Sequence, residues 1–131
     1  MVPLIGKRKD PDLFGKLEAV EVLSWYDGPR TFTLLDTDGG LCLAHWLDED
    51  GDSMRFVVVP VRARDIEQLQ RGSLTLLEVL DQPRVYAVDQ ENRGQVRTVW
   101  LTTLAALPQD ALPAKGVTLN RDAQSAGASA A

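Results

Sequence analysis

The chain has 131 residues, of which 44% are hydrophobic, 25% charged and 6% aromatic, a composition typical of one small globular domain. A single cysteine excludes an internal disulfide and any zinc site built from several cysteines, so a reducing, cytoplasmic setting is expected. The 19 acidic and 14 basic residues give a net charge of -5, which argues against a general binder of nucleic acids or anionic membranes.

Neither end of the sequence predicts export or membrane insertion. The basic residues at 7–9 follow a short apolar stretch, whereas a secretory signal begins with its positive charge. The longest strongly apolar segment, 56–61, is far shorter than the roughly 20 residues of a transmembrane helix. Residues 120–131 are small and polar, so we predict a disordered tail there and a single domain over 10–119.

Strand patterns dominate the first half of the chain, and each ends at residues that favour tight turns. Residues 17–26 are rich in Val, Leu and aromatic side chains and stop at Asp27-Gly28-Pro29, which predicts a hairpin. Residues 31–35 alternate, with Phe32 and Leu34 on one face and threonines on the other.

Two further strands, 41–47 and 54–61, are predicted on either side of a polar turn over 48–53. Pro60 has no backbone N–H for a ladder, so it favours an edge strand or a strand end. Successive side chains of strand 41–47 point to opposite faces of the sheet. One face has Leu41, Leu43, His45 and Leu47, and the other has Cys42, Ala44 and Trp46.

The period changes to three after residue 61, which predicts a short helix that begins near Ala63 and ends at Gly72. A second short helix is predicted at 74–80, with Ser73 as its cap or with Thr75 and Glu78 as a capping box one register later. The remaining predicted elements are strands at 85–89 and 96–101 and a helical turn at 103–107. Together they predict an α+β fold with a mainly antiparallel sheet, a meander plus the later strand pair, and short helices on one face.

The usual catalytic motifs are missing from the sequence, which has no GxGxxG, P-loop, HExxH or GxSxG. His45, the only histidine, is the most enzyme-like residue, but strand spacing places it on the face opposite Cys42. A half-buried histidine with a satisfied hydrogen bond is therefore favoured over a catalytic one. We predict no catalytic residue, cofactor or metal site.

The acidic turns match a calcium-binding loop only in part. Asp48, Asp50 and Asp52 fit the first three side-chain positions of an EF-hand, but Ser53 and Val59 stand where the loop needs its Gly and its bidentate Glu. Turn chemistry explains these aspartates without a metal.

Charge is distributed unevenly, since the stretch from residue 36 to residue 52 has six acidic side chains and no Lys or Arg. In a meander alternate turns share an edge, so the turn after residue 25 and the turn near residue 50 should lie together, away from Asp36 and Asp38. Aromatic anchors with a charged rim are typical of protein interfaces. The candidate interaction residues are Trp25, Tyr26, Asp27, Arg30, Asp48, Glu49, Asp50 and Asp52. The simpler alternative places Trp25 in the core and leaves the acidic side chains merely solvated.

Three segments carry a family resemblance, and they are Tyr26-Asp27-Gly28-Pro29, Trp46-Leu47-Asp48-Glu49 and Val58-Val59-Pro60-Val61, followed by Leu69 and Gly72. With them the chain resembles an uncharacterised bacterial family of small domains of unknown function, over roughly residues 11–106. These are turn and core residues, so the resemblance implies a prokaryotic, cytoplasmic setting and no particular active site.

We expect a non-catalytic protein-interaction domain, an accessory, regulatory or inhibitory partner in a bacterial system, with a basic protein as the narrower choice of partner. The alternative is a small enzyme or ligand-binding domain that uses His45 as a general base together with turn carboxylates. We expect no nucleic-acid or membrane partner. Exposed strand edges are compatible with a homodimer.

Overall fold

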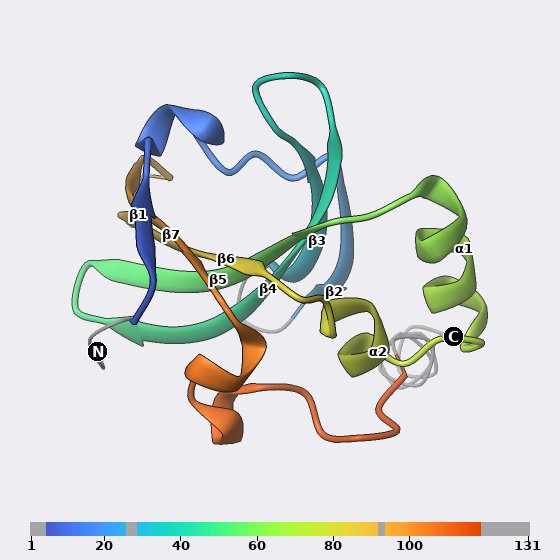
Figure 1. Cartoon of the computed structure of the whole chain (residues 1–131). Helices are drawn as coiled ribbons and strands as arrows, with labels where there is room; N and C mark the ends of the chain where they lie inside the picture. Colours follow the sequence, from blue (N-terminus) through green and yellow to red (C-terminus); the bar gives the residue numbers. More distant parts are fainter. Residues whose placement is uncertain (1–4, 26–28, 92–93, 119–131) are drawn as a thin grey trace.

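The computed structural model describes residues 5–25, 29–91 and 94–118, and of Trp25 and Pro29 it describes only the backbone. Within these residues the fold is one seven-stranded antiparallel sheet with the strand order β1-β7-β6-β5-β4-β3-β2 (Figure 1). The strands are β1 (Lys7–Lys9), β2 (Glu21–Trp25), β3 (Pro29–Leu35), β4 (Leu41–Asp50), β5 (Ser53–Pro60), β6 (Val85–Glu91) and β7 (Val96–Thr102). The helices are α1 (Ala63–Arg71) and α2 (Leu76–Leu80), with 3-10 turns η1 (Pro11–Leu13), η2 (Leu104–Ala106) and η3 (Gln109–Ala111).

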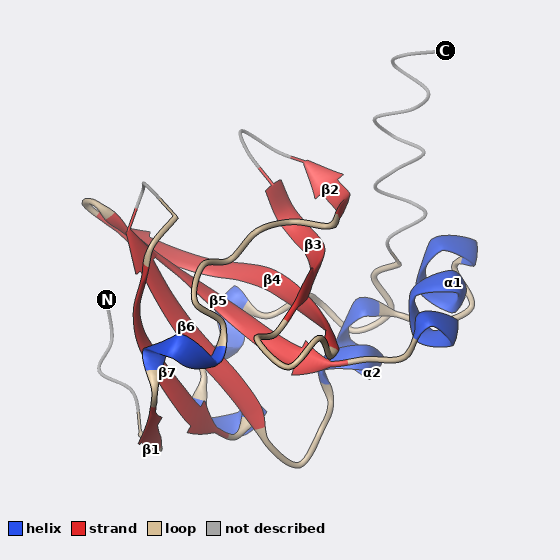
Figure 2. Cartoon of the chain, turned by 90° about the horizontal axis from the view of Figure 1, so that it is seen from above, coloured by secondary structure: helices blue, strands red, loops and turns tan. Residues whose placement is uncertain are grey.

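Strands β2 to β7 form a meander in chain order, and β1 pairs with β7 at the far edge. Because β1 and β2 follow each other in the chain but lie at opposite edges, the segment that joins them crosses one face of the sheet (Figure 2). This segment carries η1 and is held by backbone contacts at both sides. An isolated bridge joins Lys16 to Gln95, and the Thr37 N–H donates to the Leu13 carbonyl at 3.1 Å.

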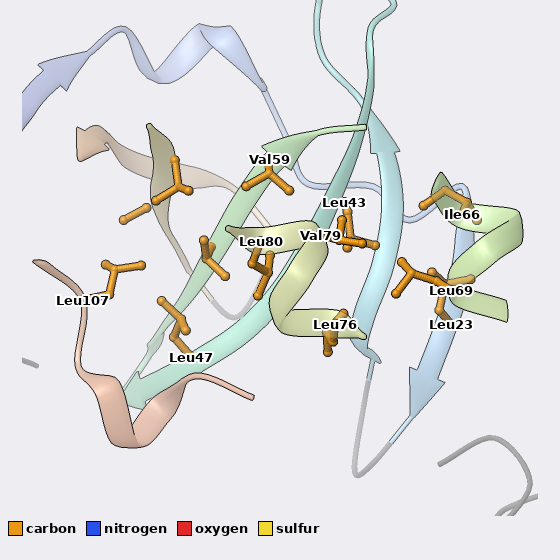
Figure 3. Packing of buried hydrophobic residues seen from close by; sticks show 13 residues of the cluster. Leu23, Leu43, Leu47, Val59, Ile66, Leu69, Leu76, Val79, Leu80 and Leu107 are labelled. Atoms are coloured by element: carbon orange, nitrogen blue, oxygen red, sulfur yellow. The ribbon is translucent and has the colours of Figure 1, made fainter. Parts of the chain in front are cut away.

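The helices and the turns after β7 cover the other face of the sheet. Figure 3 shows the buried side chains of β4 and β5 on this face meeting those of α1 and α2. Each such aliphatic side chain contributes about 1.5–3 kcal/mol when it is fully buried. The labelled members of this cluster are Leu23, Leu43, Leu47, Val59, Ile66, Leu69, Leu76, Val79, Leu80 and Leu107.

A second core cluster lies on the face that the N-terminal segment crosses. Phe14 and Leu17 of that segment are buried there against side chains from β3 to β7. Two aromatic pairs, Phe32 with Phe56 and Phe14 with Tyr86, pack edge to face with ring centroids 5.4 Å apart. Since both faces of the sheet are covered, β5 is apolar on both sides, which explains its nearly continuous hydrophobic run.

The α+β fold class predicted from the sequence is confirmed, and the alternation in 31–35 and 41–47 separates the two core clusters as expected. Pro60 is the last residue of the central strand β5, so of the two predicted positions, an edge strand or a strand end, it occupies the strand end. The later strand pair joins the same sheet, because Val58 of β5 is in register with Tyr86 of β6. Gly72 ends α1 in the left-handed region with φ 78°.

Two local predictions were wrong. The polar turn at 48–53 is mostly strand, because β4 continues to Asp50 and β5 begins at Ser53. The predicted strand 17–26 begins only at Glu21. Of the two caps predicted for the second helix, the Thr75 capping box is confirmed: the Thr75 hydroxyl and the Glu78 carboxylate each accept a backbone N–H of the other residue.

The sheet begins with β1, ahead of residue 10, where the sequence places the start of the domain. The predicted tail at 120–131 lies outside the described residues. Among the residues that are described, no helix combines the length and the apolar character that crossing a membrane requires.

Candidate interaction surface

The β2–β3 and β4–β5 hairpins turn at the same end of their strands. Trp25 is in register with Pro29 at one hairpin end, and Asp50 with Ser53 at the other. The register of β3 with β4 ends at His45, whereas β4 continues for five more residues. At about 3.4 Å per residue, Asp50 therefore lies roughly 14 Å beyond Trp46 along the strand. Within the described residues, β4 therefore extends beyond the start of β3.

Arg30 and Trp46 form a cation–π pair at this end of the strands. The Arg30 guanidinium carbon lies 4.2 Å from the centroid of the Trp46 ring, within the range of a cation–π contact. Trp46 also packs against the second core cluster, and within the described residues its buried Nε1 has no hydrogen-bond partner. The strand alternation predicts only the sheet face of Trp46, because its stack with Arg30 depends on the pairing of β3 with β4.

The acidic hairpin tip consists of Asp48, Glu49, Asp50 and Asp52. The side chains of the last three are exposed, and Asp48 is half-buried with its Oδ1 accepting the Glu49 N–H at 2.8 Å. Within the described chain, Glu49 and Asp52 form no ion pair. Their carboxylates therefore remain available to an external cation.

Arg97 is the cation that the structure places beside this tip. Its Nη1 donates to the Ser53 hydroxyl at 2.8 Å, and its Nε lies 3.8 Å from Glu91 Oε1. This charge is engaged on the β6 side of the hairpin and does not pair with the tip. Arg97 therefore leaves Glu49 and Asp52 without an ion pair within the described residues, whereas Asp50 has an interaction of its own.

The structure brings together only part of the predicted interaction set. Arg30 contacts Trp46, and the four acidic residues share one hairpin. Tyr26, Asp27 and the side chain of Trp25 fall outside the described residues. The described surface is therefore an acidic tip next to a cation–π pair.

The second acidic turn lies at the opposite end of β4. There Asp36 Oδ1 accepts the N–H groups of Asp38 and Gly40 at 2.9 and 2.8 Å, which is ordinary turn chemistry. Among the described residues, no three His, Cys, Asp or Glu side chains are grouped in a way that could hold a metal ion.

His45 lies on the helix-covered face, in register with Thr31 on β3 and Val57 on β5. Its Nδ1 shares a hydrogen bond of 2.8 Å with the Thr31 hydroxyl. Burial lowers the pKa of His45 to about 4, so the ring is neutral and weakly basic at pH 7. Cys42 belongs to the cluster on the other face, as its spacing from His45 predicts.

Comparison with known proteins adds a family but no activity. Neither the curated proteins nor the solved structures include a match to this chain. A family of unknown function matches residues 8–130, a range that extends past the predicted 11–106 at both ends. Because the match covers nearly the whole chain, the protein belongs to the family of unknown function DUF6575.

Proposed function

We propose that this protein is a non-catalytic interaction domain that binds a basic protein partner through its acidic hairpin tip. The observation that carries the proposal is the pair of exposed carboxylates, Glu49 and Asp52, at the end of the β4–β5 hairpin. Exposed charges of one sign steer an oppositely charged partner and accelerate its association. The Arg30–Trp46 stack beside the tip supplies the kind of aromatic and arginine side chains in which interfaces are enriched.

The enzyme alternative has less physical support. A general base is most effective when its pKa lies near the working pH, and the pKa of His45 is about 4. The hydrogen bond with Thr31 also occupies Nδ1 of the ring. A bacterial setting and a cytoplasmic location remain part of the proposal, because the resemblance and the single cysteine favour them.

The test is affinity capture from cells of the source organism at low and at moderate salt, with mass spectrometry of the bound proteins. The variant Glu49→Gln/Asp52→Asn removes two tip charges, and Glu67→Gln/Asp110→Asn removes the same two residue types from exposed positions elsewhere. We expect a basic protein that wild type and the control bind at low salt, and that the tip variant loses. Salt should weaken this binding, because exposed charges are screened over about 8 Å at physiological ionic strength. Equal capture by the tip variant and wild type would refute the proposal.

A further inference from the structure

An open groove lies at the end of the sheet away from the acidic hairpin tip. It lies where β1 begins and β7 ends. At this end of the sheet, Val85 of β6 is in register with Thr102 of β7. Its volume is about 490 Å³, within the range of roughly 300–1,000 Å³ that small-molecule sites occupy. Figure 1 shows β1 and β7 side by side, with the chain turning into η2 directly after β7.

The walls of the groove are largely apolar. Ile5, Leu101 and Ala106 supply hydrocarbon surface, and Ile5 is 78% exposed. Gly6 lies so close to the Leu101 carbonyl that a Cβ atom would collide with it, so glycine lets the chain pack here. The Thr102 hydroxyl donates to the Ile5 carbonyl and holds the same segment in place.

Two cations line the same groove without a counter-charge. Lys7 and Arg84 are both exposed, and neither forms an ion pair within the described residues. No acidic residue is among the groove's lining residues. In a chain with a net charge of -5, two unpaired cations on an apolar groove create a local preference for an anion.

We infer that this groove binds a small organic monoanion, a carboxylate with an apolar body. Lys7 and Arg84 would receive the carboxylate, and Ile5, Leu101 and Ala106 would contact the hydrocarbon part. The net negative charge of the protein disfavours a polyanion, and the apolar walls disfavour a bare inorganic anion. This site is independent of the acidic hairpin tip, which lies at the other end of the strands.

Titration of the full chain with octanoate, below its micelle concentration and followed by amide NMR, tests the inference. We expect localised shifts at Leu101, Thr103 and Ala106, and much smaller shifts with 1-octanol, which has the same chain without the charge. Lys7→Gln and Arg84→Gln should weaken octanoate binding about threefold each and about tenfold together, the scale of solvent-exposed ion pairs. Both side chains are exposed, so the spectra should show that the variants remain folded.

The matched control is Lys115→Gln/Arg71→Gln, which removes the same residue types from exposed positions outside the groove and should leave the affinity unchanged. Three results would each overturn the inference: no localised shifts with octanoate, equal shifts with 1-octanol, or unaltered affinity in the Lys7→Gln/Arg84→Gln variant. The Glu49→Gln/Asp52→Asn variant should bind octanoate like wild type, so failure at the tip and failure at the groove are separable.

Discussion

Thr31 and His45 face each other across the β3–β4 pair, and their side chains share a hydrogen bond of 2.8 Å between Thr31 Oγ1 and His45 Nδ1. Thr31 is fully buried, so this bond satisfies a polar group that water cannot reach. Thr31 is thus the hydrogen-bond partner of the half-buried histidine that the sequence predicts.

His45 should titrate far below an ordinary histidine. Burial lowers its pKa to about 4, and as the only histidine it gives a single resolved ring signal in an NMR titration. We expect a midpoint near pH 4 for the folded protein. A midpoint near the ordinary value of about 6.5 would show that the ring is hydrated and would support the alternative that His45 acts as a general base.

The same shift makes stability depend on pH. The unfolded chain binds a proton at His45 from about pH 6.5 downward, whereas the folded chain binds it only near pH 4, so acid favours unfolding in this window. The free energy of unfolding should therefore fall by up to roughly 3 kcal/mol between pH 7 and pH 4 because of this residue. Urea unfolding of wild type and His45→Gln measures it, and the variant should lose less stability over the same pH range. Identical pH dependence in the two proteins would contradict the prediction.

Removal of the Thr31 hydroxyl should destabilise the protein through His45. Thr31→Val keeps the shape of the side chain but leaves Nδ1 without its partner, at a cost of about 1–2 kcal/mol in the free energy of unfolding. In a His45→Leu background the same substitution should cost nothing or should stabilise the protein, since the buried Thr31 hydroxyl has already lost its His45 partner. An equal cost in both backgrounds would mean that packing, not the hydrogen bond, explains the effect.

Arg55, which is buried, and Asp89, which is partly buried, form an ion pair between β5 and β6. Arg55 Nε lies 2.6 Å from Asp89 Oδ1 and its Nη2 lies 2.9 Å from Oδ2, while the Thr98 hydroxyl donates to Oδ2 at 3.2 Å. Arg55→Met should cost about 3–5 kcal/mol, because it leaves the carboxylate partly buried and unpaired. The double variant Arg55→Met/Asp89→Leu should be more stable than this single variant in urea unfolding. A double variant less stable than Arg55→Met would show that the unpaired Asp89 carboxylate is not the source of the cost.

Much of the fold follows from local sequence signals. The alternation in β3 and β4, the left-handed Gly72 after α1 and the Thr75 capping box all depend on residues a few positions apart, so sequence reasoning can identify them. β1 gives no such signal. It consists of Lys7, Arg8 and Lys9, and it becomes a strand only because β7, about 90 residues later, offers its edge.

The candidate site also combines features that the local sequence predicts with contacts between residues distant in the chain. The acidic stretch is visible in the sequence, but the charged residues Asp48 to Asp50 predict a turn, and only pairing with β5 extends β4 through them. The Arg30–Trp46 stack and the groove at Lys7 and Arg84 join residues that are distant in the chain. Their geometry depends on strand register, which single-sequence patterns do not determine.

Cys42, the only thiol, should be unreactive in the folded protein. It is 4% exposed, and burial together with the nearby Asp36 carboxylate raises its pKa to about 11, so almost no thiolate forms at pH 8. A disulfide reagent such as DTNB should label it quickly in urea and only slowly in buffer, at a rate set by opening of the fold. Each loss of about 1.4 kcal/mol in stability, as in Arg55→Met, should then raise the labelling rate about tenfold if opening is global. Cys42→Ser supplies the blank, and fast, stoichiometric labelling of the native protein would contradict both the burial of Cys42 and its raised pKa.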